Sequence, residues 1–315
     1  MFFVRGLAVS FSVFVMVYCV LSLGVSLSWH KVRLYSQRRA VRGVADFLFA
    51  LRVFPFLSAA IVTAVFTVPS FLLLEPRAIN EPVGEIPLAL GVAGALLGLF
   101  GVVNAALASR RASRKISEWT RAAQPVSISA PVPVLRIQRT VPAMTVTGIV
   151  RPRVLLSGAA ESMLSAGELR TALNHEVVHV RRQDNLRKLF LRFVAFPGMG
   201  SLEAAWLEAS EMAADDAAVC NAGEALDLAV ALIKLSRLGP VENVDLTAAL
   251  VHHRASVMNA RVERLIAWNE SRQVRPRKYS PWYGLGAGLA MVAVFAVTYS
   301  QLLVHVHAAT EWLVR

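Results

Sequence analysis

The residues with the clearest chemical potential are two histidines and a glutamate in the stretch TALNHEVVHVRRQDN, residues 171–185. His175 and His179 are four residues apart, so on a helix both imidazoles project from one face and can reach the same metal ion. Glu176 would lie beside that ion, where it could take a proton from water. This HExxH pattern predicts a zinc site of the kind that hydrolyses peptide bonds.

The neighbouring residues predict a helix that can hold this site inside a domain. Ser165 and Glu168 have the spacing of a capping box, which would begin the helix one to two turns before the motif. Apolar residues on the same helix form a stripe that can be buried. They are Leu173, Val177, Val178 and Val180. The alternative, a helix whose two histidines merely pack in a core or face solvent, does not account for these features.

A catalytic zinc needs three protein ligands, and a later stretch offers the third. Residues 204–220, AAWLEASEMAADDAAVC, are rich in good helix formers. We predict that Glu211 binds the metal. Asp215, one turn later, would accept a hydrogen bond from the outer N–H of a ligating histidine and so fix its tautomer. Glu208 and Asp216 remain as rival ligands.

The motifs HEVVHVRRQDNL and SEMAADDAAV resemble those of the BlaR/MecR antirepressor type of integral membrane zinc peptidase, in which HExxH is followed by a basic pair and an Asp, and later by ExxxD. The segment TVTGIVRPRVLLS, Thr145 to Ser157, is similar to the segment that precedes the active helix in that family. Motif detail covers residues 131–220. HtpX-like membrane proteases share HExxH, the later Asp and ExxxD, so these motifs do not separate the two groups.

The resemblance implies a role for each motif residue. It implies one zinc ion with three ligands, namely His175, His179 and Glu211. Glu176 would be the general base, and Asp215 would support a ligating histidine. Asp184 matches the Asp that follows HExxH, and two interpretations stay open: it supports the zinc site, or it is the N-cap of the next helix, expected at 185–196.

The composition predicts a membrane protein. The chain of 315 residues is 56% hydrophobic and 17% charged, and its mean hydropathy is +0.52, which is too apolar for an ordinary soluble domain. The net charge of +12 comes from three acid-free basic clusters beside apolar stretches, at 31–42, 110–115 and 272–278. Contact with anionic lipid headgroups explains them better than nucleic acid. The two cysteines, Cys19 and Cys220, are expected to be buried thiols without a disulfide.

Long apolar runs predict four transmembrane helices. Three come first, at 2–28, 53–74 and 86–108, and the fourth is at 281–305. We therefore expect an α+β membrane protein: a membrane region at 1–108, a zincin-like, mostly helical domain at 109–280, the fourth span, and a short external tail at 306–315. Arg52, at the edge of the second span, is expected to reach the membrane surface.

The domain at 109–280 is expected to combine helices with a small β-sheet. Strands are predicted at 132–138, 144–150 and 153–157, and one at an edge of the sheet could pair with an extended substrate. Helices are predicted at 109–122, 224–238 and 246–269, besides those that carry the motifs. His252 and His253 are expected on a surface helix.

The basic clusters predict that domain 109–280 is cytoplasmic and that both termini are outside. Three spans before the domain and one after match the BlaR/MecR layout, whereas HtpX-like proteins divide their spans more evenly. The resemblance then implies a bacterial inner-membrane endopeptidase that cleaves a cytoplasmic repressor, itself, or both, with a partner subunit or a second copy as further partners.

The sequence offers less support for three other functions. Direct β-lactam sensing is not expected, because Ser28 to Lys31 fits only the first element of the penicillin-binding motif set. A membrane signalling subunit with a vestigial zinc domain would be free to lose the HEVVH and ExxxD residues, yet they are intact. A membrane-tethered DNA binder would need the basic clusters to bind nucleic acid without lipid.

Overall fold

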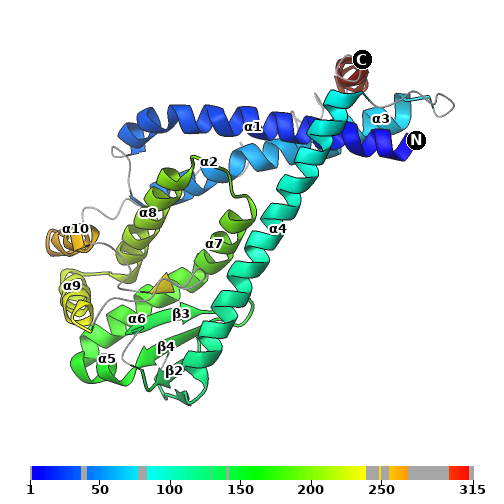
Figure 1. The fold of residues 1–315 in the computed structure, drawn as a ribbon. Coiled ribbons are helices and arrows are strands. Elements are labelled where there is room, and N and C mark those ends of the chain that lie inside the picture. Colours follow the sequence, from blue (N-terminus) through cyan, green and yellow to red (C-terminus); the bar gives the residue numbers. More distant parts are fainter. Residues whose placement is uncertain are drawn as a thin grey trace. The chain divides into compact units, whose positions relative to one another are not determined.

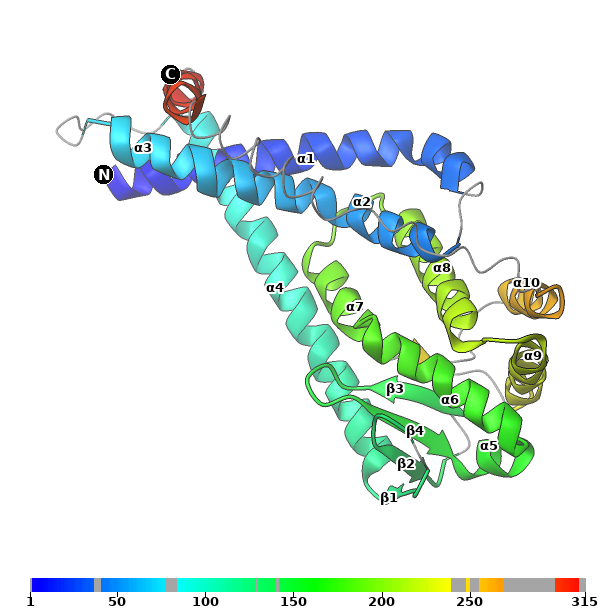
Figure 2. The ribbon, with the colours of Figure 1, turned by 180° about the vertical axis from the view of Figure 1, so that it is seen from behind.

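The chain folds into two compact units. The computed structural model describes residues 2–36, 41–76, 84–128, 130–139, 142–238, 248–249, 255–268 and 298–311. The first unit comprises residues 1–30, 51–100 and 275–315, and the second comprises 31–50 and 101–274. Figures 1 and 2 show their helices and strands from two sides.

Long apolar helices make up the first unit. The N-terminal helix is α1 (Phe2–Ser36). Helix α2 (Val41–Ile61) runs through a π-helical turn at Val62–Thr67 into α3 (Val68–Leu74), and α4 spans Glu85–Thr120. Three stretches are long and apolar enough to cross a membrane: Phe2–Trp29, Gly43–Leu74 and Glu85–Thr120. These stretches confirm the first three predicted spans, with the second beginning ten residues earlier than expected.

Helices α1 and α4 approach each other through glycines. A Cβ atom at Gly94 would lie 2.7 Å from the carbonyl oxygen of Phe11, and one at Gly91 would lie 3.0 Å from that of Ala8. Gly98 has open space around it. Ser12 donates a hydrogen bond to the carbonyl of Pro87 at 2.7 Å. The close approach therefore uses Gly91 and Gly94, which permit backbone contact because they lack a side chain.

Two further expectations for the first unit concern Arg52 and the fourth span. Arg52, expected to extend toward the membrane surface, is 1% exposed and hydrogen-bonds the buried Tyr18. The predicted fourth span, 281–305, lies outside the described residues up to 297. Residues 298–311 are helical, and Tyr299 donates to the carbonyl of Val65 in the π-helical turn at 2.7 Å.

A small sheet with helices on both faces forms the second unit. The strands are β1 (Gln124–Pro125), β2 (Val134–Ile137), β3 (Met144–Thr147), β4 (Arg153–Ser157) and β5 (Ala248–Ala249), in the order β1-β2-β4-β3-β5. Strands β2 and β4 are parallel, and the other pairs are antiparallel.

The three predicted strands are confirmed, but β2 and β3 are shorter than expected. Strand β3 ends at Thr147 because Gly148 has a φ of +87°, which begins the turn to β4. The residues of β5 fall in a range predicted as helix, and β5 pairs with β3 at Thr145 and Val146.

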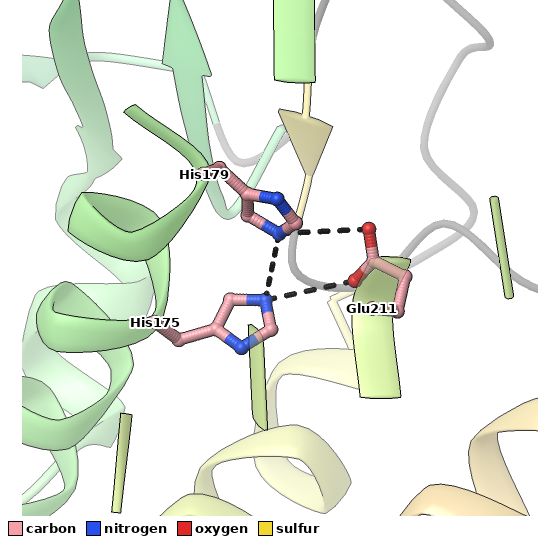
Figure 3. A group of neighbouring side chains, drawn as sticks. All are labelled: His175, His179 and Glu211. Carbon is pink, nitrogen blue, oxygen red and sulfur yellow. Dashed lines mark hydrogen bonds and ion pairs between the residues drawn. The ribbon is translucent and has the colours of Figure 1, made fainter. Parts of the chain in front are cut away.

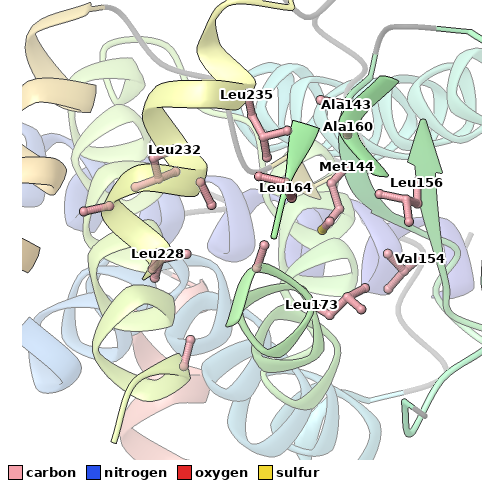
Figure 4. Close-up of a cluster of buried hydrophobic side chains, with 14 of the residues drawn as sticks. Ala143, Met144, Val154, Leu156, Ala160, Leu164, Leu173, Leu228, Leu232 and Leu235 are labelled. Carbon is pink, nitrogen blue, oxygen red and sulfur yellow. The ribbon is translucent and has the colours of Figure 1, made fainter. Parts of the chain in front are cut away.

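Alternation along β4 explains why both faces of the sheet are covered. Val154 and Leu156 belong to the larger core cluster, drawn in Figure 4, whereas Leu155 belongs to a second cluster. Successive side chains of a strand point to opposite faces. The larger cluster packs against helices α6 (Ala166–Arg181) and α9 (Ala222–Ser236). The second packs against residues 112–119 of α4, so the predicted separate helix at 109–122 is a continuation of α4.

The remaining helices are α5 (Gly158–Met163), α7 (Asp184–Phe193), α8 (Gly200–Ala218) and α10 (Ala255–Ile266). Helix α10 lies within the range predicted at 246–269, while His252 and His253 lie outside the described residues. Cys220, expected to be buried, is exposed because it follows the end of α8, whereas Cys19 is partly buried. Both cysteines are free thiols.

Candidate metal centre

Helix α6 begins where the sequence predicted and presents both histidines. Ser165 Oγ accepts from the Glu168 N–H at 3.3 Å, and Glu168 accepts from the Ser165 N–H at 2.8 Å, which completes the capping box. Leu173, Val177 and Val178 are buried. This anchoring fixes the helix rotation that turns His175 and His179 into the unit.

Three side chains from two helices bring their donor atoms together. His175 Nε2 and His179 Nε2 are 3.1 Å apart. Each is 3.6 Å from a different carboxylate oxygen of Glu211 on α8. Figure 3 shows the two rings and the carboxylate facing one another. All three residues are buried, and one ligand atom from each lies within 4.8 Å of the others.

The outer nitrogens of both histidines contact carboxylates. His175 Nδ1 is 2.9 Å from Asp215 Oδ1, and His179 Nδ1 is 2.6 Å from Asp184 Oδ2. An N–H directed to each of these acids leaves the Nε2 lone pairs directed at the shared point. Two lone pairs that face each other at 3.1 Å would be satisfied by a shared proton or by a metal ion. The donor set of two imidazole nitrogens and one carboxylate fits zinc.

The charges around the site also favour a cation. Burial alone would lower the pKa of His175, but hydrogen bonds to Asp215 and Glu211 raise it to about 9. Burial would raise the pKa of Glu211, yet the nearby His179, His175 and Arg261 hold it well below its usual value. Glu211 is therefore a carboxylate, the form that binds metal.

Glu176 is a buried carboxyl group with unused oxygens. It is 0% exposed, and neither carboxyl oxygen has a hydrogen-bond partner in the described part of the chain. Burial raises the pKa of Glu176 to about 7, against the opposing effect of the two histidines. A group with such a pKa can both take up and release a proton near neutral pH.

Arg261 on α10 completes the site, and no pattern in the sequence predicts this role for Arg261. It is fully buried, donates to both oxygens of Asp215 at 2.7 Å, and lies 3.2 Å from Glu211 Oε2. Burial alone would raise the pKa of Asp215, but Arg261 and His175 lower it to about 2. An arginine on a helix 46 residues after Asp215 has no spacing that marks it, and only the packing of α10 brings it to α8.

The structure places Asp184 in contact with the site. The N-cap of α7 is Gln183, whose φ of 55° is left-handed, and Asp184 is the first residue of the helix. Its carboxylate contacts His179, as given above. Asn185 then donates to the carbonyls of Val146 and Gly148 at 3.3 Å, which ties the start of α7 to the end of β3.

Two further features near the site were not predicted. Lys188 on α7 is close enough to Glu211, Asp184 and Glu176 for their charges to oppose the lowering of its pKa by burial. A cavity of about 190 Å³ lies between His179 and the β3–β4 turn, and Val146, Ile149 and other mostly apolar residues line it. It can accept a side chain next to the metal ligands.

The rival ligands lie elsewhere. Glu208 is exposed, and Asp216 pairs with Arg264 at 2.6 Å. In the first unit, Glu75, His307 and Glu311 form another group with donor atoms within 4.8 Å. There the Glu311 side chain is 44% exposed, and Glu75 already pairs with Arg5 at 2.8 Å. The buried group around His175 is the stronger metal site.

Comparison with known proteins points to one family. The family model described as BlaR1 peptidase M56 matches residues 57–265, which include every residue of this metal centre and the second and third candidate spans in part or whole. No curated protein matches the chain.

Proposed function

Because the chain belongs to the BlaR1 peptidase M56 family of metallopeptidases, we propose that it is an integral membrane zinc endopeptidase that cleaves a cytoplasmic regulatory protein, itself, or both. One observation carries the proposal: two imidazoles and a carboxylate converge beside a buried glutamate whose oxygens have no other described partner. Three apolar helices that are long enough to span a bilayer support the membrane part of the proposal.

In the proposed mechanism, His175, His179 and Glu211 hold one zinc ion. When bound, zinc supplies a Lewis acid that polarises the scissile carbonyl and makes a water molecule more acidic. Glu176 takes the proton from the attacking water and transfers it to the nitrogen of the leaving amine. Asp215 and Asp184 hold the two imidazoles in the tautomer that can bind metal.

The surroundings suggest how a protein substrate would bind. Strand β5 pairs antiparallel with β3, with Ala248 opposite Val146, so an extended substrate would pair with β3 only by displacing this two-residue strand. Extended binding of this kind relies on main-chain hydrogen bonds and makes few demands on sequence. The cavity beside His179 would then receive one mostly apolar substrate side chain.

The proposed topology follows from charge. The basic clusters at 31–42, 110–115 and 272–278 would keep domain 109–280 in the cytoplasm. Both termini and a fourth span at 281–305 belong to the same proposal. A substrate regulator would accordingly be a cytoplasmic protein, as in the antirepressor pathway that the family resemblance implies.

Replacing Glu176 by Gln tests the proposal. The amide keeps the shape but cannot accept the proton, so turnover should fall by at least about 100-fold while zinc content stays at about one ion per chain. The soluble proteins of cells that express the parent or Glu176→Gln would be compared for a fragment that only the parent produces. His175→Ala, as a second variant, should lose the zinc. Proteolysis by Glu176→Gln at the parent rate would remove Glu176 from this role.

A further inference from the structure

One turn of α2 contacts the C-cap of α6, helix α7 and helix α8. Asp46 and Phe49 lie three residues apart, so they project from one face of this helix. Both belong to the second unit, whereas α2 from Leu51 onward belongs to the first. This turn of α2 therefore packs inside the unit that holds the metal centre.

Asp46 contacts the segment that follows the metal-binding helix. Its Oδ1 accepts from Arg187 Nη1 at 2.7 Å and from Arg182 Nη2 at 3.3 Å. Arg182 is the C-cap of α6, three residues after His179. The Arg182 side chain is 17% exposed and that of Asp46 is 57% exposed. The carboxylate on α2 thus holds two arginines of the α6–α7 junction.

From Arg182 the contacts lead directly to a metal ligand. Arg182 Nε is 3.7 Å from Asp184 Oδ1, and Asp184 Oδ2 is 2.6 Å from His179 Nδ1. Asp184 is 1% exposed, so its charge interacts strongly with its neighbours. Arg182 is positioned to orient the Asp184 carboxylate, which in turn fixes the His179 ring.

Phe49 makes the second contact. Its ring lies 5.8 Å from that of Trp206, and the Arg187 guanidinium stands 5.1 Å from its centroid. Trp206 is fully buried on α8, five residues before Glu211. A shift of this turn of α2 would act on α6 through Asp46 and on α8 through Phe49, and these two helices supply all three ligands.

We propose that Asp46 is a positioning residue of the metal centre: through Arg182 and Asp184 it sets the geometry around His179. This inference rests on the proposed function and adds to it a residue outside the metal-binding helices that holds the ligand geometry. A change at this turn of α2 would weaken metal coordination.

The test compares metal binding in full-length variants in detergent. Zinc affinity is measured by competition with a fluorescent chelator, and the geometry is read from the visible absorption spectrum of the cobalt-substituted protein. Asp46→Asn should weaken zinc binding by about 3- to 10-fold, less than the roughly 10- to 100-fold typical of groups that contact a ligand directly, and should change the cobalt spectrum. Asp46→Glu should retain most of the parent affinity.

Two controls separate an effect of Asp46 that acts through Arg182 and Asp184 from a general loss of stability. Glu161 pairs with Arg136 at 2.6 Å in the same unit, away from the site, so Glu161→Gln should leave affinity and spectrum unchanged. Arg182→Gln should weaken zinc binding as Asp46→Asn does, and the double variant should be no weaker than Arg182→Gln alone, because both act on Asp184.

Three outcomes would contradict the inference. They are an Asp46→Asn protein with the parent affinity and spectrum, an equal effect of Glu161→Gln, and full additivity in the double variant. Cleavage is not part of the measurement: a parent that binds zinc but cuts nothing would contradict the proposed function and leave this comparison intact.

Discussion

At the scale of single residues, the centre is a layered set of charges. Asp215 contacts the proposed ligand His175, and Arg261 contacts both Asp215 and the proposed ligand Glu211. Arg261 compensates the buried negative charge of this group. Because Arg261 also lies beside Glu211, it connects α10 to both Glu211 and Asp215 on α8.

Removing this cation should be costly. Arg261→Ala would leave Asp215 buried without its partner, and we expect a loss of about 3–5 kcal/mol in the free energy of unfolding. Thermal denaturation of the purified protein would measure it, together with a drop in zinc affinity. Arg264→Ala is the matched control, since Arg264 pairs with the partly exposed Asp216, and its cost should stay within about 1 kcal/mol. Equal stability of the two variants would mean that Arg261 does not have this role.

At the scale of elements, helix α6 depends on its N-terminal cap. Glu168 closes the capping box and also accepts from Lys234 of α9 at 2.8 and 2.9 Å. The same side chain therefore caps the start of α6 and ties this helix to α9. The rotation of α6, and with it the direction of His175 and His179, relies on this junction and on the apolar stripe below it.

The capping group gives a pH-dependent stability. Burial would raise the pKa of Glu168, but Lys234 and the Ser165 N–H lower it overall. A lowered folded-state pKa means that the stabilisation is present above the unfolded-state pKa and is lost as the pH falls through the folded-state value. Glu168→Gln should therefore cost about 1 kcal/mol at pH 7, and the difference should vanish once the pH falls below the lowered folded-state pKa of Glu168.

Unfolding of parent and variant by denaturant at several pH values would check this dependence. Glu118→Gln, which removes an exposed carboxylate 3.8 Å from Lys115, should change stability by only a few tenths of a kcal/mol, about the usual value for such pairs. A Glu168→Gln deficit that is constant from pH 7 to acid would show that the charge contributes nothing.

At the scale of the whole molecule, three helices have residues in both compact units: α1, α2 and α4. Helix α4 continues from Glu85 to Thr120 because residues 102–122 contain neither proline nor glycine to end it. At these three places the boundary between the units therefore falls within a continuous helix rather than in a loop.

The proposed topology can be tested with the free thiols. Cys220 is exposed, whereas Cys19 lies partly buried within a candidate span. A thiol reagent that cannot cross membranes should modify Cys220 in inverted vesicles, where the cytoplasmic face is outside, and not in intact cells whose inner membrane faces the reagent. Cys220→Ser should abolish the labelling. Modification of Cys220 from the outer side of intact cells would place the catalytic unit outside and overturn the topology.

The sequence by itself determined the local features. The HExxH spacing, the capping box and the apolar runs predicted the metal-binding helix, its start and three candidate spans, because each depends on residues close together in the chain. The sequence also predicted the strands β2, β3 and β4. The resemblance to the BlaR/MecR type agrees with the family match over residues 57–265.

Only the tertiary structure decided what lies far apart in sequence. It brought Arg261 to Asp215, Asp46 to Arg182, and a two-residue strand to the edge of β3. It also directed Asp184 toward His179, a choice that the local sequence left open because an acid at the start of a helix suits both roles. Such contacts depend on how helices pack, and packing is a property of the whole set of buried surfaces rather than of any one segment.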